Sequence, residues 1–142
     1  MGCQPNRRAF IIHGVDDARA VLTAASPTGE PVALWSGPGA AAYIGAPMFR
    51  EIIDAATSEF AAIDAIGVLD CGRDPGFALA AFRHGIEFVW VDFPPATLFR
   101  VANIARQTGA TIIRKRPPAL DLAGCTEPIA ACRNWLSKPR PQ

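Results

Sequence analysis

The sequence predicts an α/β fold: a three-layer α/β/α sandwich around a mainly parallel five-stranded sheet, Rossmann-like or flavodoxin-like. The main observation is that short apolar runs alternate along the chain with longer segments of helical period. The runs are also continuous, as is typical of strands covered on both faces. The alternative is that the units curl as part of a barrel, but five units are too few to close a (β/α)₈ barrel.

Five strands are expected, each from a run of apolar and β-branched residues. They are 9–13, 31–36, 65–71, 86–92 and 110–115. Because strand–helix–strand crossovers are right-handed, the five strands should all run parallel, with helices on both faces. The pattern leaves the strand order open.

Helices are expected between these strands. The most clearly marked one begins at Asp74 and Pro75, an N-cap followed by proline at the first helical position, and stops at Gly85. Three further helices are indicated over about 47–63, after Pro94 and over about 127–137, the last capped by Thr126 behind an irregular arm.

Composition limits the functional classes. The 142 residues suit one domain, 1–142, with flexible ends at 1–8 and 138–142, and the net charge of +1 gives no general attraction to nucleic acid or an anionic membrane. The stretch 31–49 is uncharged, yet glycines and prolines interrupt it too often for a membrane-spanning helix. Only 19% of residues are charged, which indicates a subunit interface and favours a homodimer. A cytoplasmic location is expected because no signal-peptide pattern is visible.

Ligands of open α/β sheets bind outside the carboxyl ends of the strands, so the residues at these ends are the candidate site. The predicted ligand-binding residues follow the second, third and fifth strands. They are Ser36, Gly37, Gly39, Gly72, Lys115 and Arg116. The two basic residues would attract an anion, although charges at this position also protect an edge strand from pairing with another chain.

Gly37 to Ala42, "GPGAAA", has the spacing of a dinucleotide-binding loop after a strand. Pro38 removes one amide donor, and no acidic residue ends the next strand at the usual distance. Three interpretations remain: an anion on the loop amides, a dinucleotide site, or a tight turn.

Asp70, Asp92 and His13 are the candidate catalytic residues. The two aspartates end consecutive strands and would share a proton or hold Mg²⁺ if those strands are neighbours, or else accept hydrogen bonds from loop amides. Cys71 is an alternative nucleophile, with His13 or His84 as its base. Of the two, His13 is better placed, because His84 is predicted at the far end of the third helix, away from the strand ends. The four cysteines show no CxxC pair, which argues against a zinc site, and no particular cofactor is indicated.

The stretches "LWSGPGAAAYIGAPMF" and "LDCGRDPGFALAAFRHG" carry a resemblance. With them the chain, from about residue 9 to 120, resembles a group of small bacterial α/β proteins of unassigned function, which implies one cytosolic α/β domain and no particular reaction. The chain is also similar to response-regulator receiver domains in Asp70 and Lys115, but it has Asp92 where the receiver pattern has Ser or Thr.

Three functional classes follow. The first is a module that binds a small phosphorylated or carboxylated molecule at the strand ends. The second is an enzyme that uses Asp70 and Asp92, with His13 assisting. The third is an oligomeric interaction protein, in which Trp35, Trp90 and Trp135 would serve an interface.

Overall fold

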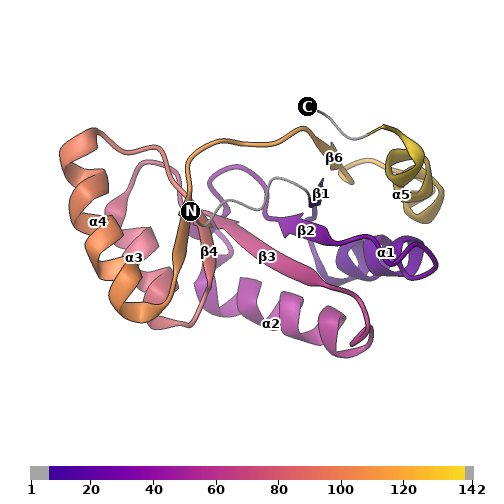
Figure 1. Ribbon diagram of the computed structural model, residues 1–142, viewed down its shortest axis with the longest axis horizontal. Helices are drawn as coiled ribbons and strands as arrows, with labels where there is room; N and C mark the ends of the chain where they lie inside the picture. Colours follow the sequence, from indigo (N-terminus) through magenta and orange to yellow (C-terminus); the bar gives the residue numbers. More distant parts are fainter. Residues whose placement is uncertain (1–6, 140–142) are drawn as a thin grey trace.

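The computed structural model describes residues 7–139 of the chain. Six parallel strands form one sheet in the order β5-β4-β3-β2-β1-β6 (Figure 1). The prediction of an α/β fold with a mainly parallel sheet is therefore confirmed, and the sheet has six strands where five were expected. The predicted flexible ends fall mostly outside the described residues, but Arg8 is buried and its guanidinium binds the carbonyls of Trp135 and Lys138.

The strands are short and the helices alternate with them. The strands are β1 (Arg8–Ile11), β2 (Val32–Trp35), β3 (Ala65–Asp70), β4 (Phe88–Trp90), β5 (Thr111–Ile113) and β6 (Ala119–Asp121). The helices are α1 (Val15–Ala25), the 3₁₀ turn η1 (Ala40–Ala42), α2 (Gly45–Ser58), α3 (Pro75–Arg83), α4 (Pro95–Thr108) and α5 (Pro128–Ser137).

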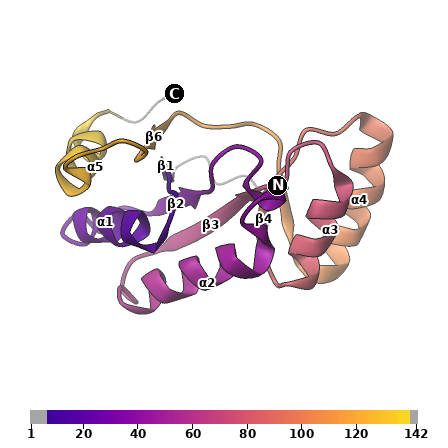
Figure 2. The same cartoon turned by 180° about the vertical axis from the view of Figure 1, so that it is seen from behind.

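The helices gather on one side of the sheet, which differs from the expected covering of both faces. Strands β1 to β5 are neighbours in chain order, so right-handed crossovers place α1 to α4 on the same face. Successive helices contact one another, and α5 contacts α1. Figures 1 and 2 show this row from α4 to α5 around one side of the sheet. Helices on one face of consecutive parallel strands are the arrangement expected for units that curl as part of a barrel. The sheet nevertheless stays open, with β5 and β6 as its edge strands.

Alternate strand residues point to opposite faces. Phe10, Leu34, Leu69 and Val89 pack against the helices. The other face, called here the helix-free face, carries a cluster made of strand residues alone: Ala9, Ile11, Ala33, Trp35, Ile66, Val68, Phe88, Trp90, Ile113 and Ala119. Both faces are apolar, which explains why the runs in the sequence are continuous.

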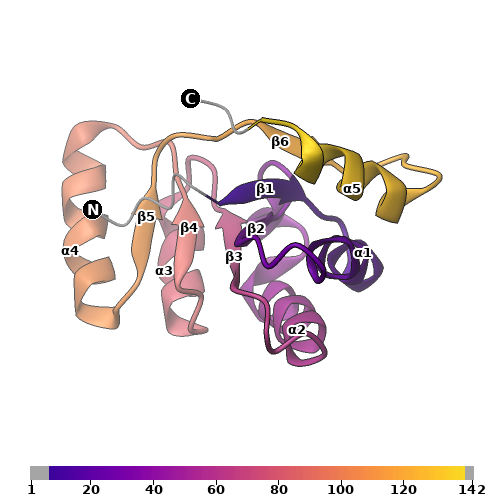
Figure 3. The ribbon, with the colours of Figure 1, turned by 45° about the vertical axis from the view of Figure 1, so that its right-hand side comes forward.

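Strand β6 lies in the segment expected to be an irregular arm, so that expectation was wrong. Residues 114–118 carry the chain from β5 at one edge to β6 at the other without a helix, as Figure 3 shows. There β6 pairs in parallel with β1, with Ala119 opposite Ala9. The sequence hid this strand because it has only three residues and follows two prolines.

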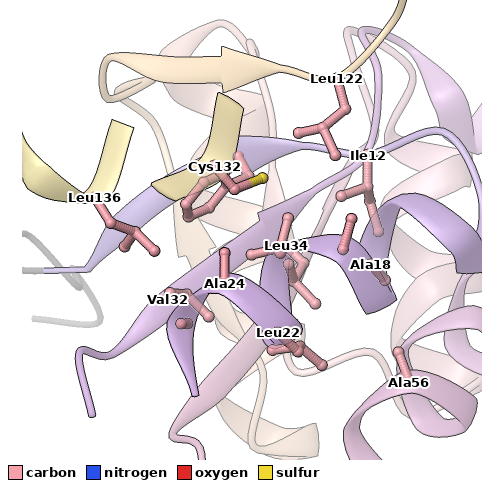
Figure 4. Close-up of a cluster of buried hydrophobic side chains, with 14 residues drawn as sticks. Ile12, Ala18, Leu22, Ala24, Val32, Leu34, Ala56, Leu122, Cys132 and Leu136 are labelled. Atoms are coloured by element: carbon pink, nitrogen blue, oxygen red, sulfur yellow. The ribbon is translucent and has the colours of Figure 1, made fainter. Parts of the chain in front are cut away.

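The main core lies between the sheet and the helix layer. Figure 4 shows part of it, where Ile12, just after β1, comes together with Leu22 of α1, Leu34 of β2, and Cys132 and Leu136 of α5. Burying each large side chain stabilises the fold by about 1.5–3 kcal/mol. On β3, a Cβ at Gly67 would lie 2.7 Å from Ile53, so glycine lets α2 pack directly on the strand.

The predicted start and end of α3 are confirmed, because both depend on a specific local geometry. The Asp74 carboxylate accepts a hydrogen bond from the amide of Gly76 at 2.8 Å, and Gly85 ends the helix with a φ of 75°. Thr126 does not cap α5, because the N-cap is Glu127 and its side chain makes no capping bond.

No helix in the part of the chain between residues 7 and 139 has the length and apolar character needed to cross a membrane.

Candidate functional site

The carboxyl ends of the first four strands lie side by side, because β1 to β4 are consecutive neighbours in the sheet. The residues at or just after these strand ends therefore lie along the carboxyl end of the sheet. They are His13, Ser36, Asp70 and Asp92. Arg116 joins them from the segment that crosses the helix-free face, since its side chain reaches Asp70.

Asp70 is a buried carboxylate held by an arginine and an amide. Its side chain is 0% exposed, and its Oδ1 accepts a hydrogen bond from the amide of Gly72 at 3.0 Å. Its Oδ2 lies 2.6 Å from Nη2 of Arg116, close enough for an ion pair but without a hydrogen-bond partner of suitable geometry. The charge of Asp70 is thus balanced by Arg116, while one oxygen keeps unused accepting capacity.

Arg116 also stacks on Trp90. Its guanidinium carbon lies 3.8 Å from the centroid of the indole ring, within the range of a cation–π contact. The side chain of Arg116 remains 40% exposed, so it faces solvent as well as Asp70. Below it, Nε1 of Trp90 is buried without a hydrogen-bond partner in the described structure. Two buried polar atoms, one donor and one acceptor, therefore lie on neighbouring strands next to an accessible cation.

Asp92 follows β4, the neighbour of β3, but it has a separate partner. Its Oδ2 lies 3.1 Å from Nε of Arg73, and its amide donates to the carbonyl of Gly72. Each predicted catalytic aspartate is therefore paired with its own arginine. Within residues 7–139 no group of three or more His, Cys, Asp or Glu side chains is arranged to hold a metal ion.

The loop after β2 forms a tight turn. The Ser36 hydroxyl accepts a hydrogen bond from the amide of Asp70 at 2.9 Å and donates to the Gly37 carbonyl, which ties β2 to β3. Gly39 has a φ of 65° and precedes η1, which is three residues long, and the α-helix begins only at Gly45. The amide of Gly72 donates its hydrogen bond to the carboxylate of Asp70. These residues shape the edge of the site, and Lys115 beside Arg116 is exposed.

His13 forms a second polar cluster with Asp121, which is not among the predicted site residues. Its Nε2 lies 2.7 Å from Oδ1 of Asp121, the last residue of β6. Its backbone amide donates to the carboxylate of Asp17 at 2.8 Å. A Cβ at Gly37 would lie 3.2 Å from the His13 ring and 3.1 Å from the Tyr43 hydroxyl. Asp121 was missed because the strand that positions it was missed.

The environment of Asp121 favours its ionised form. Burial acts to raise the pKa of this carboxyl, but the hydrogen bond from the Ala123 amide and the hydrogen bond and charge of His13 together bring the pKa below its ordinary value. Asp121 therefore accepts hydrogen bonds as a carboxylate near neutral pH.

The structure argues against Cys71 as a nucleophile. The residue is 1% exposed and packs on the helix side of the sheet. Burial, with a smaller contribution from the charge of Asp70, raises the pKa of its thiol to about 12. His84 caps the end of α3, away from the carboxyl ends of the strands.

A groove of about 470 Å³ opens elsewhere, at the amino ends of β3 and β4. It is bounded by Phe49, Arg50, Ile53, Gly67, Gly85 and Glu87, among others. None of the predicted site residues lines it.

The protein is an α/β protein with a parallel sheet and its helices on one face. Comparison with known proteins finds relatives that match over part of their length. No family model matches the chain. It is similar to proteins named fructose-bisphosphate aldolase from Xanthobacter flavus (31% identity over 84 residues), Pseudomonas aeruginosa and Stutzerimonas stutzeri (each 33% over 84 residues). Each match covers 59% of this chain and 24% of the relative, so the chain spans about a quarter of the length of the curated relatives it matches.

Proposed function

We propose that the protein binds a small phosphorylated or carboxylated molecule at the carboxyl ends of its strands, with Arg116 as the main cation. The observation that carries this proposal is the position of the Arg116 guanidinium, which is fixed by Trp90 and Asp70 yet 40% exposed. A guanidinium has five N–H donors, and pairing with one carboxylate oxygen leaves most of them for a ligand.

Two further observations support a phosphorylated ligand. Lys115 adds an exposed positive charge next to Arg116. The relatives are named for fructose bisphosphate, which carries two phosphate groups. Under this proposal Ser36, Gly37, Gly39 and Gly72 form the wall of the site through their backbone geometry, and nucleic acid and membranes are not partners.

Calorimetric titration of the protein with fructose 1,6-bisphosphate, inorganic phosphate and citrate tests the proposal. We expect at least one of these anions to bind, and Arg116→Met to weaken binding about tenfold or more, as expected for the loss of a charge-assisted hydrogen bond. Arg83→Met is the matched control, because Arg83 lies in the last turn of α3, away from the strand carboxyl ends. No binding by any of the three anions, or equal losses in the two variants, would overturn the proposal.

A catalytic function for Asp70, Asp92 and His13 is the second proposal. It is favoured by the hydrogen bond between His13 and Asp121 at the same edge of the sheet. Under this second proposal Asp70 and Asp92, each paired with its own arginine, act as separate carboxylates rather than as a pair that shares a proton.

We further propose that the protein is a cytoplasmic homodimer. The thiols of Cys71, Cys125 and Cys132 are free, as suits a reducing compartment. Tyr43, Met48 and Phe99 are large apolar side chains that are 66%, 54% and 68% exposed. Light scattering coupled to size exclusion measures the mass in solution, and a monomer at high concentration would contradict the dimer.

A further inference from the structure

We propose that His13 and Asp121 form a proton-transfer pair, in which Nδ1 of His13 takes a proton from an acidic C–H or O–H group of a ligand lying beside Gly37. This rests on the proposed catalytic role of His13 and specifies it, and it does not depend on anion binding at Arg116. It rests on a cluster that joins β1, β6 and the loop after β2, with the two paired residues 108 positions apart in the sequence.

The hydrogen bond fixes which nitrogen is the base. The Asp121 carboxylate can only accept, so the proton of the neutral imidazole must be on Nε2, which lies 2.7 Å from Oδ1. The lone pair is then on Nδ1. The lowered pKa of Asp121 agrees with an ionised acceptor. An imidazole oriented in this way by a carboxylate is the arrangement of a general base.

The pair is held from several sides. Oδ1 of Asp121 also accepts from the amide of Ala123 at 2.9 Å, which fixes the carboxylate. The backbone of His13 is tied to Asp17 on α1. Such anchoring keeps the ring in one orientation without a ligand present, which general-base catalysis requires.

Access to Nδ1 depends on Gly37. A Cβ at this position would lie 3.5 Å from Nδ1 and 3.2 Å from Cε1 of His13, and 3.1 Å from the Tyr43 hydroxyl. Glycine therefore leaves this edge of the imidazole uncovered, and the His13 side chain is 40% exposed. The Tyr43 hydroxyl, which donates to the Pro38 carbonyl at 3.2 Å, lies 3.1 Å from the same Cβ position and offers a hydrogen-bonding group beside the His13 ring.

The step balances without a further reactant. The ligand's C–H or O–H bond breaks, its electron pair stays on the ligand, and the proton forms a new N–H bond at Nδ1. The resulting imidazolium keeps its Nε2–H bond to Asp121, whose negative charge stabilises it. Return of the proton to the same or another ligand atom restores the neutral ring. Asp17 from α1 and Asp121 from β6 are hydrogen-bonded to His13, and the Tyr43 hydroxyl lies with the His13 ring beside Gly37.

Ring opening of a nitrobenzisoxazole tests the base directly. In this reaction the base removes the ring C–H proton, the C–H electron pair forms the nitrile, and the N–O bond breaks to give a coloured phenolate. We expect the protein to accelerate it and His13→Gln to remove about 99% of that acceleration, the lower end of general-base contributions. His84→Gln is the matched control, because His13 and His84 are the two histidines of the chain.

Two variants separate a base from a structural histidine. Asp121→Asn, which leaves an amide in place of the carboxylate, should lower the rate about tenfold, and Gly37→Ala should block access to Nδ1 with folding retained by circular dichroism. If His13→Gln does not fold, carbethoxylation of the wild type and of Asp121→Asn replaces it, with His84 as the internal reference. Equal rates in the wild type and in folded His13→Gln, or His13 reactivity unchanged in Asp121→Asn, would overturn the proposal.

Discussion

The two faces of the sheet differ in what covers them and in the chemistry at their carboxyl ends. The helix side is packed with apolar residues, and the Cys71 thiol, which follows β3 on that side, is buried. The helix-free face carries the strand-only apolar cluster, on which Arg116 stacks over Trp90 and pairs with the buried carboxylate of Asp70. The larger apolar core therefore lies on one face, and the exposed Arg116 guanidinium with its buried partners lies on the other.

This difference follows from the winding of the chain. Because β1 to β5 are consecutive, every helix from α1 to α4 must pack on the same side. The opposite side is crossed only by residues 114–118 among the described connections, and this segment brings Arg116 to Asp70. A segment without regular structure is thus what completes the candidate site.

The largest expected contrast is in thiol reactivity. Burial raises the pKa of both Cys71 and Cys132 to about 12 from an ordinary 9.0, so their thiolate fraction near pH 8 falls about a thousandfold. Alkylation followed by peptide mapping should find both residues unmodified in the folded protein while Cys125 reacts. Rapid labelling of Cys71 would show that the helix side opens at the strand ends.

Truncation of core residues compares the two faces directly. Leu69 is fully buried on the helix side, so Leu69→Ala should cost about 3 kcal/mol of unfolding free energy. Ile66 is half-buried on the helix-free face, so Ile66→Ala should lower the free energy of unfolding by about 1–2 kcal/mol. Urea denaturation measures both. A loss at Ile66 equal to that at Leu69 would indicate that something covers the helix-free face in solution.

The ion pair between Asp70 and Arg116 should respond unequally to removal of its two members. Arg116→Ala leaves a fully buried carboxylate without its cation, and because Arg116 is itself 40% exposed we expect a loss of about 2–3 kcal/mol. Asp70→Asn removes the buried charge, and the arginine can turn to water, so the loss should be about 1 kcal/mol. Urea unfolding of both single variants and the double variant checks this order, and a larger loss for Asp70→Asn would contradict it.

The smallest effect concerns Asp121. Its pKa is lower in the folded than in the unfolded state, so its contribution to stability is present above the unfolded pKa and disappears as the pH falls through the folded one. Since the side chain is 49% exposed, this contribution is below about 1 kcal/mol. The urea midpoint of the wild type should fall slightly more between about pH 6 and pH 3 than that of Asp121→Asn. An identical pH dependence would contradict the pairing.

The sequence predicted those parts of the fold that depend on local signals. The alternation of apolar runs and helical segments indicated the α/β class, and Asp74 with Pro75 marked the start of α3. Strand order, however, depends on contacts between distant residues, so the one-sided helix layer was not foreseen. The short strand β6 was missed because its sequence, Ala119-Leu120-Asp121, has no β-branched residue and directly follows two prolines.

The candidate site was predicted in part for the same reason. The rule that ligands bind at strand carboxyl ends selected His13, Asp70 and Arg116. It did not reveal that Arg116 pairs with Asp70, nor that Asp121 meets His13, because both contacts depend on the crossing to β6. The anion site and the reactions at these residues stay predictions.

The indole signals in a nitrogen–proton NMR spectrum test the central claim most directly. The chain has three tryptophans, and Trp90→Phe assigns the signal of Trp90, which lies under the Arg116 guanidinium. On titration with fructose 1,6-bisphosphate we expect a saturable shift of the Trp90 signal and loss of this response in Arg116→Met. The signal of Trp135, which lies in α5 and donates to the carbonyl of Ala9, should not shift. A Trp90 signal that does not move, or that moves equally in Arg116→Met, would contradict an anion site at this edge of the sheet.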